Sequence, residues 1–140
     1  IKLVMLDFDG TIADSFASVI SCAGKMCKDA GIPFDKSVIE NNMGCTTESC
    51  ISLISGSSDP EVIERLTAAY NVIYRREGLD MIELFDSVLD TVKSLHQKGV
   101  KFAITSNNVV PAVTISIYAI QDKNEVLIMY KAALMQYTKS

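Results

Sequence analysis

Apolar positions in the first part of the chain form one short continuous run followed by a long stretch of helical spacing. Residues 1–6 read I-K-L-V-M-L, a nearly unbroken apolar run that is typical of a central strand in a parallel sheet. Apolar residues then recur every three or four positions over residues 16–30, and Gly31 and Pro33 end the pattern. The sequence therefore predicts a buried strand followed by a helix that Asp14 caps.

Polar capping residues mark the starts of further helices. Asp35 is expected to open a short helix, and Thr46 or Thr47 a third one. The string Asp59-Pro60-Glu61 is a strong helix start, because it combines a capping acid, a proline in the first turn and a second acid near the positive end of the helix dipole. Asp86 is expected to cap the helix that follows.

The order of the predicted elements indicates an α/β fold. A second strand is predicted over residues 100–105, so that several helices separate two strands. Such a long crossover indicates a parallel sheet with an inserted helical subdomain. Beyond it, strict alternation over residues 113–119 predicts a half-buried strand, and helical spacing over residues 126–137 predicts a helix.

Composition and charge narrow the range of partners. The chain has 140 residues, 49% hydrophobic and 21% charged, which is typical of a globular domain rather than a disordered segment. Its net charge of −4 comes without a basic patch, so we expect no nucleic-acid partner. The apolar stretch Val109–Ile120 is too short to span a bilayer, and we recognise no signal peptide before the first strand. We therefore expect a cytoplasmic protein with no membrane partner.

Four cysteines, Cys22, Cys27, Cys45 and Cys50, form two C-x4-C spacings. Zinc sites use tighter spacings, and the single histidine, His96, lies far away in the sequence. Disulfide frameworks are typical of small secreted domains, whereas this chain has enough apolar residues for a core. We therefore expect reduced, half-buried cysteines.

Two carboxylates, Asp7 and Asp9, follow the first apolar run. Alternate residues of a strand point the same way, and ligands of open α/β sheets bind beyond the carboxyl ends of the strands. Both carboxylates are thus expected at one site, where Mg²⁺ would offset their repulsion and Gly10 would let the backbone approach an anion. A carboxylate can attack phosphorus. An ordinary strand-end turn is the alternative interpretation, while a calcium loop is excluded because Ser18 stands where a glutamate is needed.

Residues 3–15, L-V-M-L-D-F-D-G-T-I-A-D-S, closely resemble the first motif of the haloacid dehalogenase-like hydrolase superfamily. Residues 99–107, G-V-K-F-A-I-T-S-N, are similar to its second motif, a strand that ends in a phosphate-binding Ser or Thr. The helices between them look like the cap of phosphoglycolate phosphatase-like and β-phosphoglucomutase-like members. The resemblance implies an α/β fold with an incomplete Rossmann-like parallel sheet core, residues 1–14 and 86–140, and an inserted helical cap, residues 15–85.

The resemblance also implies a role for each matching residue. Asp7 would be the nucleophile that becomes an aspartyl-phosphate, and Asp9 would be the general acid and base. Asp7 and the backbone carbonyl of Asp9 would hold Mg²⁺, the implied cofactor. The phosphate group of a small phosphorylated metabolite would be bound by five residues: Phe8, Asp9, Gly10, Ser106 and Asn107.

The later family motifs, which supply a lysine and one or two further acids, are not recognisable after residue 108. Residues 109–140 form an atypical tail in which Asp122 and Lys123, or Lys131, are candidates to replace them. Without the strand that carries the fourth motif, the first strand is expected at a sheet edge. The leading hypothesis is a magnesium-dependent phosphatase. The alternative is a truncated, inactive fragment or binding protein, and a phosphomutase is less favoured.

Overall fold

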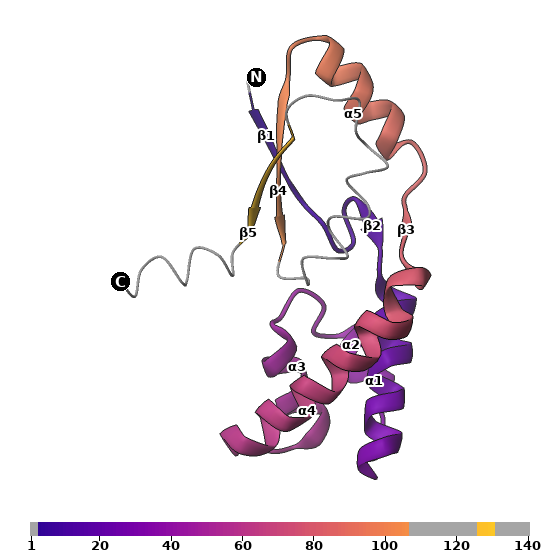
Figure 1. Ribbon diagram of the computed structural model, residues 1–140, viewed down its shortest axis with the longest axis vertical. Helices are drawn as coiled ribbons and strands as arrows, with labels where there is room; N and C mark the ends of the chain where they lie inside the picture. The colour runs from indigo at the N-terminus through magenta and orange to yellow at the C-terminus, as the bar shows by residue number, and fades with distance from the viewer. Residues whose placement is uncertain (1–2, 107–125, 131–140) are drawn as a thin grey trace, which may run out of the picture. The chain divides into compact units, whose positions relative to one another are not determined.

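The computed structural model describes residues 3–106 and 126–130 (Figure 1). The chain divides into two compact units, a sheet unit of residues 1–15 with 83–140 and a helical unit of residues 16–82. No helix in the described ranges is both long and apolar enough to cross a membrane.

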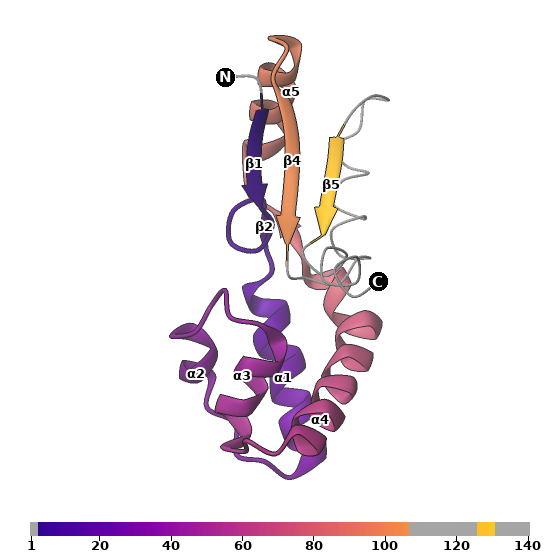
Figure 2. The ribbon, with the colours of Figure 1, turned by 90° about the vertical axis from the view of Figure 1, so that its left-hand side faces the viewer.

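The sheet unit contains a three-stranded parallel sheet in the order β1-β4-β5, visible in Figure 2. The strands are β1 (Leu3–Asp7), β4 (Lys101–Ser106) and β5 (Val126–Tyr130). β1 pairs with β4 from Leu3 opposite Lys101 to Asp7 opposite Thr105. Among the described strands β4 is therefore central and β1 lies at an edge. This order agrees with the expected edge position of the first strand and differs from the central position that its apolar run suggested.

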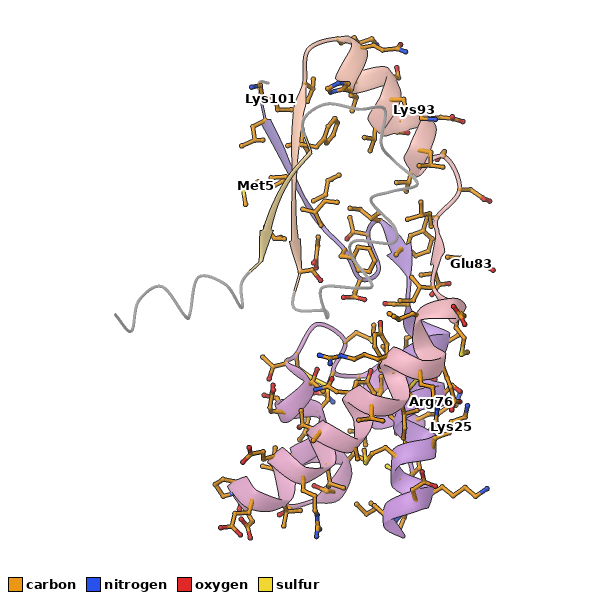
Figure 3. All side chains as sticks on the ribbon, viewed as in Figure 1. Met5, Lys25, Arg76, Glu83, Lys93 and Lys101 are labelled. Carbon is orange, nitrogen blue, oxygen red and sulfur yellow. A yellow bond between two sulfur atoms is a disulfide. The ribbon has the colours of Figure 1, made fainter. Side chains whose placement is uncertain are left out.

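Burial follows this order of strands. In β4, Phe102, Ala103 and Ile104 are each less than 5% exposed. In β1, Leu3 is 51% and Met5 is 55% exposed, and Figure 3 shows the Met5 side chain pointing away from the ribbon of the sheet. The edge strand thus keeps apolar side chains in contact with solvent.

β5 corrects the helix that apolar spacing predicted over residues 126–137. Residues 126–130 read V-L-I-M-Y and pair in parallel with β4, from Val126 opposite Phe102 to Tyr130 opposite Ser106. A continuous run of five apolar residues fits a strand as well as a helix, and pairing with a distant strand decides between them. The strand predicted over residues 113–119 lies outside the described residues.

A two-stranded antiparallel ladder, which was not predicted, joins β2 (Ala13–Asp14) to β3 (Glu83–Leu84). The Phe85 N–H extends it by donating to the carbonyl oxygen of Ile12 at 3.1 Å. The ladder therefore brings together the two places where the chain leaves the sheet unit and returns to it.

Helix α5 (Val88–Gln97) begins later than the sequence predicted. Its N-cap position is Ser87, which has φ +66° and makes no side-chain capping bond, so the prediction that Asp86 caps this helix is wrong. The Val88 N–H donates to the Phe85 carbonyl oxygen at 3.3 Å. That turn precedes the helix and places its start beyond Asp86.

The helical unit, which the structure describes over its whole length, consists of four α-helices followed by a short π-helix and a short 3₁₀-helix. Helix α1 begins directly after Ser15, and the capping role predicted for Asp14 stays a prediction. The elements are α1 (Phe16–Ala30), α2 (Lys36–Glu40), α3 (Thr47–Ser55), α4 (Pro60–Ile73), the π-helix η1 (Tyr74–Gly78) and the 3₁₀-helix η2 (Leu79–Met81).

Three of the predicted helix caps are confirmed. Asp35 accepts a hydrogen bond from the Ser37 N–H at 2.9 Å. Thr46, one of the two predicted threonines, accepts one from the Ser49 N–H at 3.3 Å. Asp59 accepts one from the Glu61 N–H at 3.0 Å, with Pro60 in the first turn. These short-range bonds determine where α2, α3 and α4 begin.

The core of the helical unit forms where α1 meets α4 and the π-helix. Cys22, Met26 and Cys27 of α1 are at most 1% exposed. At the end of the π-helix the Ser18 hydroxyl donates to the Gly78 carbonyl oxygen at 2.8 Å. Only a residue without a side chain fits there, since a Cβ on Gly78 would lie 2.8 Å from the Ser18 hydroxyl oxygen.

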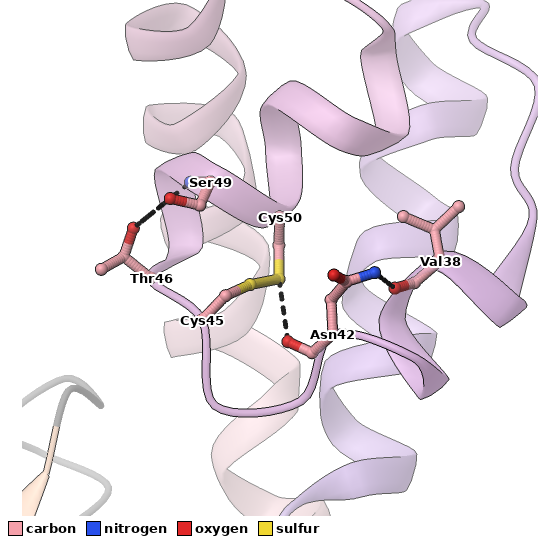
Figure 4. The surroundings of a disulfide bond; sticks show 6 residues. All are labelled: Val38, Asn42, Cys45, Thr46, Ser49 and Cys50. Atoms are coloured by element: carbon pink, nitrogen blue, oxygen red, sulfur yellow. Dashed lines mark hydrogen bonds between the residues drawn. A yellow bond between two sulfur atoms is a disulfide. The ribbon is translucent and has the colours of Figure 1, made fainter.

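The cysteines differ from the expectation of four reduced thiols. Cys22 and Cys27 are free and fully buried, but Cys45 and Cys50 form a disulfide (Figure 4). The helical structure explains the pairing, because Cys45 lies just before the N-cap of α3 and Cys50 lies one turn inside that helix. In the described residues no group of three or more metal-ligating side chains occurs that would indicate zinc.

Candidate functional site

Asp7 is the last residue of β1, and its side chain is exposed. The next residue, Phe8, is fully buried and anchors the chain as it leaves the strand. Its N–H donates to Asp7 Oδ1 at 2.8 Å. The carboxylate of Asp7 therefore lies at the carboxyl end of the strand, and the hydrogen bond from the Phe8 N–H to Oδ1 orients it.

The loop after Asp7 is a tight hydrogen-bonded turn. The Phe8 carbonyl oxygen accepts the N–H groups of Thr11 at 3.3 Å and of Ile12 and Ala13 at 3.0 Å each. Gly10 has φ +73°, a left-handed conformation that glycine adopts readily, and its N–H donates to the Ala13 carbonyl oxygen at 2.9 Å. In this structure two of the backbone groups predicted to bind phosphate, those of Phe8 and Gly10, thus already donate within the chain.

Asp9 lies in this loop and is half-buried. The hydroxyl of Ser15 donates a hydrogen bond to Asp9 Oδ1, and Ser15 itself is only 1% exposed. This contact holds the second carboxylate in one orientation. Sequence reasoning missed Ser15 as a site residue, although it ends the motif that contains both aspartates.

Ser106 is the last residue of β4 and is 5% exposed. β1 and β4 run in parallel with Asp7 opposite Thr105. Ser106 therefore lies one residue beyond that pair, at the same end of the sheet, where the strands finish. The structure thus brings Ser106 to the strand ends where Asp7 stands. Asn107, the remaining predicted phosphate ligand, lies outside the described residues, as do the substitute acid and lysines Asp122, Lys123 and Lys131.

The donor atoms at this site are of the type that Mg²⁺ prefers. Asp7 supplies a carboxylate and Asp9, two positions later, a backbone carbonyl oxygen, and magnesium is commonly held by one or two carboxylates while it keeps several water ligands. In residues 3–106 and 126–130 no third acidic, histidine or cysteine side chain joins them in a metal-binding group. The two aspartates therefore fit a weakly chelated magnesium ion rather than an all-protein metal cage.

Among curated proteins, the chain is similar to phosphatases. The chain is 27% identical over 115 residues to phosphoglycolate phosphatase of Vibrio vulnificus strain YJ016, a match that covers 76% of this chain and 50% of that protein. The phosphoglycolate phosphatase of Aliivibrio fischeri is also 27% identical, with 51% of its length covered. The chain thus spans about half the length of the curated relatives it matches.

Comparison with solved structures shows the fold. A proposed haloacid dehalogenase-like hydrolase from Bacteroides fragilis superposes with a TM-score of 0.85 at 21% identity, over 94% of this chain and 63% of that one. A haloacid dehalogenase-like family hydrolase from Streptococcus pneumoniae gives a TM-score of 0.78 at 19% identity, over 99% of this chain and 70% of that one. The fold is therefore α/β with an incomplete Rossmann-like parallel sheet core.

The sequence profile of the haloacid dehalogenase-like hydrolases matches residues 4–137. The match includes both aspartates and Ser106, and it extends beyond residue 108, where the resemblance based on motifs ended. Since it covers nearly the whole sequence, the chain belongs to the haloacid dehalogenase-like hydrolase family.

Proposed function

We propose that the protein is a magnesium-dependent phosphatase that acts on a small phosphorylated metabolite through an aspartyl-phosphate intermediate. One observation carries the proposal: Asp7 and Asp9 lie at the carboxyl end of β1, and the buried residue Ser106 lies at the carboxyl end of the neighbouring strand β4. The curated relatives named phosphoglycolate phosphatase support a small phosphorylated substrate. A cytoplasmic location without nucleic-acid or membrane partners belongs to the same proposal.

Asp7 is the proposed nucleophile. Because the Phe8 N–H holds Oδ1, Oδ2 of this exposed residue is the atom that would attack phosphorus. A bond forms between Oδ2 and phosphorus while the bond from phosphorus to the leaving oxygen of the substrate breaks. In the second step water attacks the same phosphorus, phosphate leaves, and the carboxylate of Asp7 is regenerated.

Asp9 is the proposed general acid and base. In the first step it gives a proton to the leaving oxygen, and in the second it takes a proton from the attacking water. The Ser15 hydroxyl donates to Asp9 Oδ1 and so orients the carboxylate that would make both transfers. Ser15 is therefore a positioning residue in this proposal.

The remaining groups neutralise charge on the phosphoryl oxygens. Asp7 and the backbone carbonyl of Asp9 would hold Mg²⁺, which supplies positive charge to the transferring group when bound. The hydroxyl of Ser106 would donate a hydrogen bond to a phosphoryl oxygen. Phe8 and Gly10 would have to release their present acceptors before their N–H groups could contribute.

The second candidate function is a binding protein without turnover. The described residues favour it in one respect, since no third acid joins Asp7 and Asp9 in a metal-binding group. A phosphomutase would use the same two aspartates and would require a bisphosphate intermediate. Product analysis separates it from a phosphatase, because a mutase transfers the phosphoryl group instead of releasing phosphate.

The test is phosphate release from a panel of small phosphorylated metabolites, phosphoglycolate included, with and without Mg²⁺. We expect metal-dependent release that Asp7→Asn abolishes while circular dichroism and cooperative unfolding stay unchanged. Absence of release from the folded wild-type chain would reject the phosphatase and favour the binding protein.

Ser15→Ala tests the positioning of Asp9. We expect kcat to fall about ten- to hundredfold with KM little changed, because general acid–base transfer contributes on that scale and only part of it is lost. The pH dependence of kcat should shift as well, and Ser15→Thr, which keeps the hydroxyl, should restore most of the rate. An unchanged pH profile in Ser15→Ala would argue against the positioning role.

A further inference from the structure

Cys45 and Cys50 form a covalent clip at the start of α3, in the helical unit (Figure 4). Cys45 directly precedes the N-cap residue Thr46, and Cys50 is the fourth residue of the helix. In many helices apolar side chains at these two positions pack together and fix the direction from which the chain enters. The Cα atoms of the two cysteines are 6.4 Å apart, within the range that a disulfide spans.

Cys50 also lies close to a second group, a backbone carbonyl oxygen that could accept a hydrogen bond from its thiol. Its sulfur lies 3.8 Å from the carbonyl oxygen of Asn42, a distance at which a thiol donates a weak hydrogen bond. The side-chain amide of Asn42 in turn donates to the Val38 carbonyl oxygen at 2.8 Å, which holds the residue in place. Cys50 can therefore be accommodated in both oxidation states, bonded to Cys45 when oxidised and donating to Asn42 when reduced.

Exposure distinguishes this pair from the other two cysteines. Cys45 and Cys50 are half-buried, whereas Cys22 is 1% and Cys27 is 0% exposed. Burial raises the pKa of the thiols of Cys22 and Cys27, which lowers the fraction of reactive thiolate. A small reagent in solution would therefore react at the start of α3 and spare the core of the unit.

We propose that Cys45 and Cys50 are a reversible thiol-modification site that reacts with low-molecular-weight disulfides such as oxidised glutathione. One cysteine thiolate attacks the small disulfide, forms a mixed disulfide and releases one small thiol. The other cysteine then attacks the protein sulfur of the mixed disulfide and releases the second small thiol. Two electrons pass from the protein to the small disulfide, and the two protons lost by the cysteines are taken up by the released thiols.

The modification changes the restraint on the first turn of α3. The Cys50 N–H donates to the Thr46 carbonyl oxygen at 3.0 Å, and Thr46 caps the helix through Ser49. Reduction leaves these hydrogen bonds in place but removes the covalent link across them. The turn then opens more often, and we expect the Cys50 amide hydrogen to exchange about tenfold faster in the reduced protein.

The test equilibrates the whole chain in buffers with different ratios of reduced to oxidised glutathione. Free thiols are alkylated after denaturation and mapped by mass spectrometry. At reducing ratios we expect all four cysteines to be alkylated. At oxidising ratios only Cys22 and Cys27 should be alkylated. Before alkylation, this oxidised protein should be lighter than the reduced protein by two hydrogen atoms. Returning the sample to reducing buffer should restore the first result.

Single variants provide the controls. Cys45→Ser and Cys50→Ser each remove one member of the pair, so each should stop at the mixed disulfide and gain one glutathione. Cys22→Ala should leave the titration unchanged. The proposal is overturned if Cys45 and Cys50 are alkylated at every ratio, if the disulfide forms with Cys22 or Cys27, or if the Cys50 amide exchanges equally fast in both states.

Discussion

The helical unit and the sheet unit are determined by interactions of different range along the chain. Helices α2, α3 and α4 each begin at a side-chain cap that lies within three residues of its partner. The sheet depends instead on pairs such as Leu3 with Lys101, which are far apart in the sequence. Short-range determinants are visible in a single sequence, whereas a strand's neighbours depend on the whole fold.

Two elements, α1 of the helical unit and β1 of the sheet unit, also differ in how much apolar surface they leave exposed. In the helical unit α1 buries Cys22, Met26 and Cys27 almost completely. In the sheet unit the edge strand β1 leaves Leu3 and Met5 more than half exposed. Substitutions should therefore act on stability in the core of the helical unit and on association at β1. Three variants, two of them with a matched control, test this difference.

Gly78→Ala should have the largest effect. The added Cβ would lie 2.8 Å from both the Ser18 hydroxyl and a Tyr74 ring carbon, and 3.0 Å from the Cys22 sulfur. Three groups from two packed helices would have to shift, so we expect a loss of about 1–3 kcal/mol in the free energy of unfolding. Chemical denaturation measures it.

Gly24→Ala is the matched control for this variant. Gly24 lies within α1, and the atom nearest to an added Cβ is a ring carbon of Phe34 at 3.3 Å. That contact is less severe, and alanine favours a helix over glycine by about 1 kcal/mol, so the net change should be near zero. Equal losses in the two variants would contradict the packing argument at Gly78.

Met5→Lys should affect association more than stability. Because Met5 is 55% exposed, we expect the free energy of unfolding to change by no more than about 0.5 kcal/mol. A charge on an edge strand disfavours pairing between chains, so light scattering of concentrated protein should decrease. Met43→Lys, at a 43% exposed position between α2 and α3, should leave scattering unchanged. The comparison fails if both lysines act alike.

Glu77→Gln should have the smallest effect, and one that depends on pH. Hydrogen bonds from Lys25 and Arg76 lower the pKa of the Glu77 carboxyl below its ordinary value of 4.5 (Figure 3 labels both cations). A lowered pKa means that the ion pair stabilises the fold above the unfolded-state pKa and ceases to do so as the pH falls through the folded-state value. Because the group is exposed, we expect Tm to fall by about one degree at neutral pH.

Calorimetry at two pH values measures this effect. At neutral pH Glu77→Gln should melt slightly below the wild-type chain, and at a pH well below 4.5 the two melting temperatures should converge. A difference that persists in acid would contradict the stabilising role assigned to the charge of Glu77.

Much of the fold followed from sequence patterns that act locally. The run before Asp7 predicted β1, and capping residues predicted the starts of α2, α3 and α4. The prediction of a helix at residues 126–130 failed because pairing with the distant strand β4 decides their conformation. The prediction that Asp86 caps α5 failed because a local turn from Phe85 to Val88 places the helix start later. The short ladder of β2 with β3 was missed because two-residue strands carry almost no periodicity.

The candidate site shows the same limit. Asp7 and Asp9 were found from their position at the end of a predicted strand, and Ser106 from the resemblance of residues 99–107 to a family motif. The roles of all three remain predictions. Ser15 was missed because a serine before a helix is ordinarily a capping residue, and only the folded loop brings its hydroxyl to Asp9. The Cys45–Cys50 bond was missed because its geometry depends on the first turn of α3.

The ladder of β2 with β3 has a consequence for how such a chain can change. It holds Ala13 opposite Leu84, so the 16–82 segment starts and finishes at neighbouring points. The entropy lost when a segment's ends are held together rises only slowly with its length. This segment could therefore be exchanged for one of another size while β1 and β4 keep their register. The ladder is thus the feature that makes the helical unit a replaceable module.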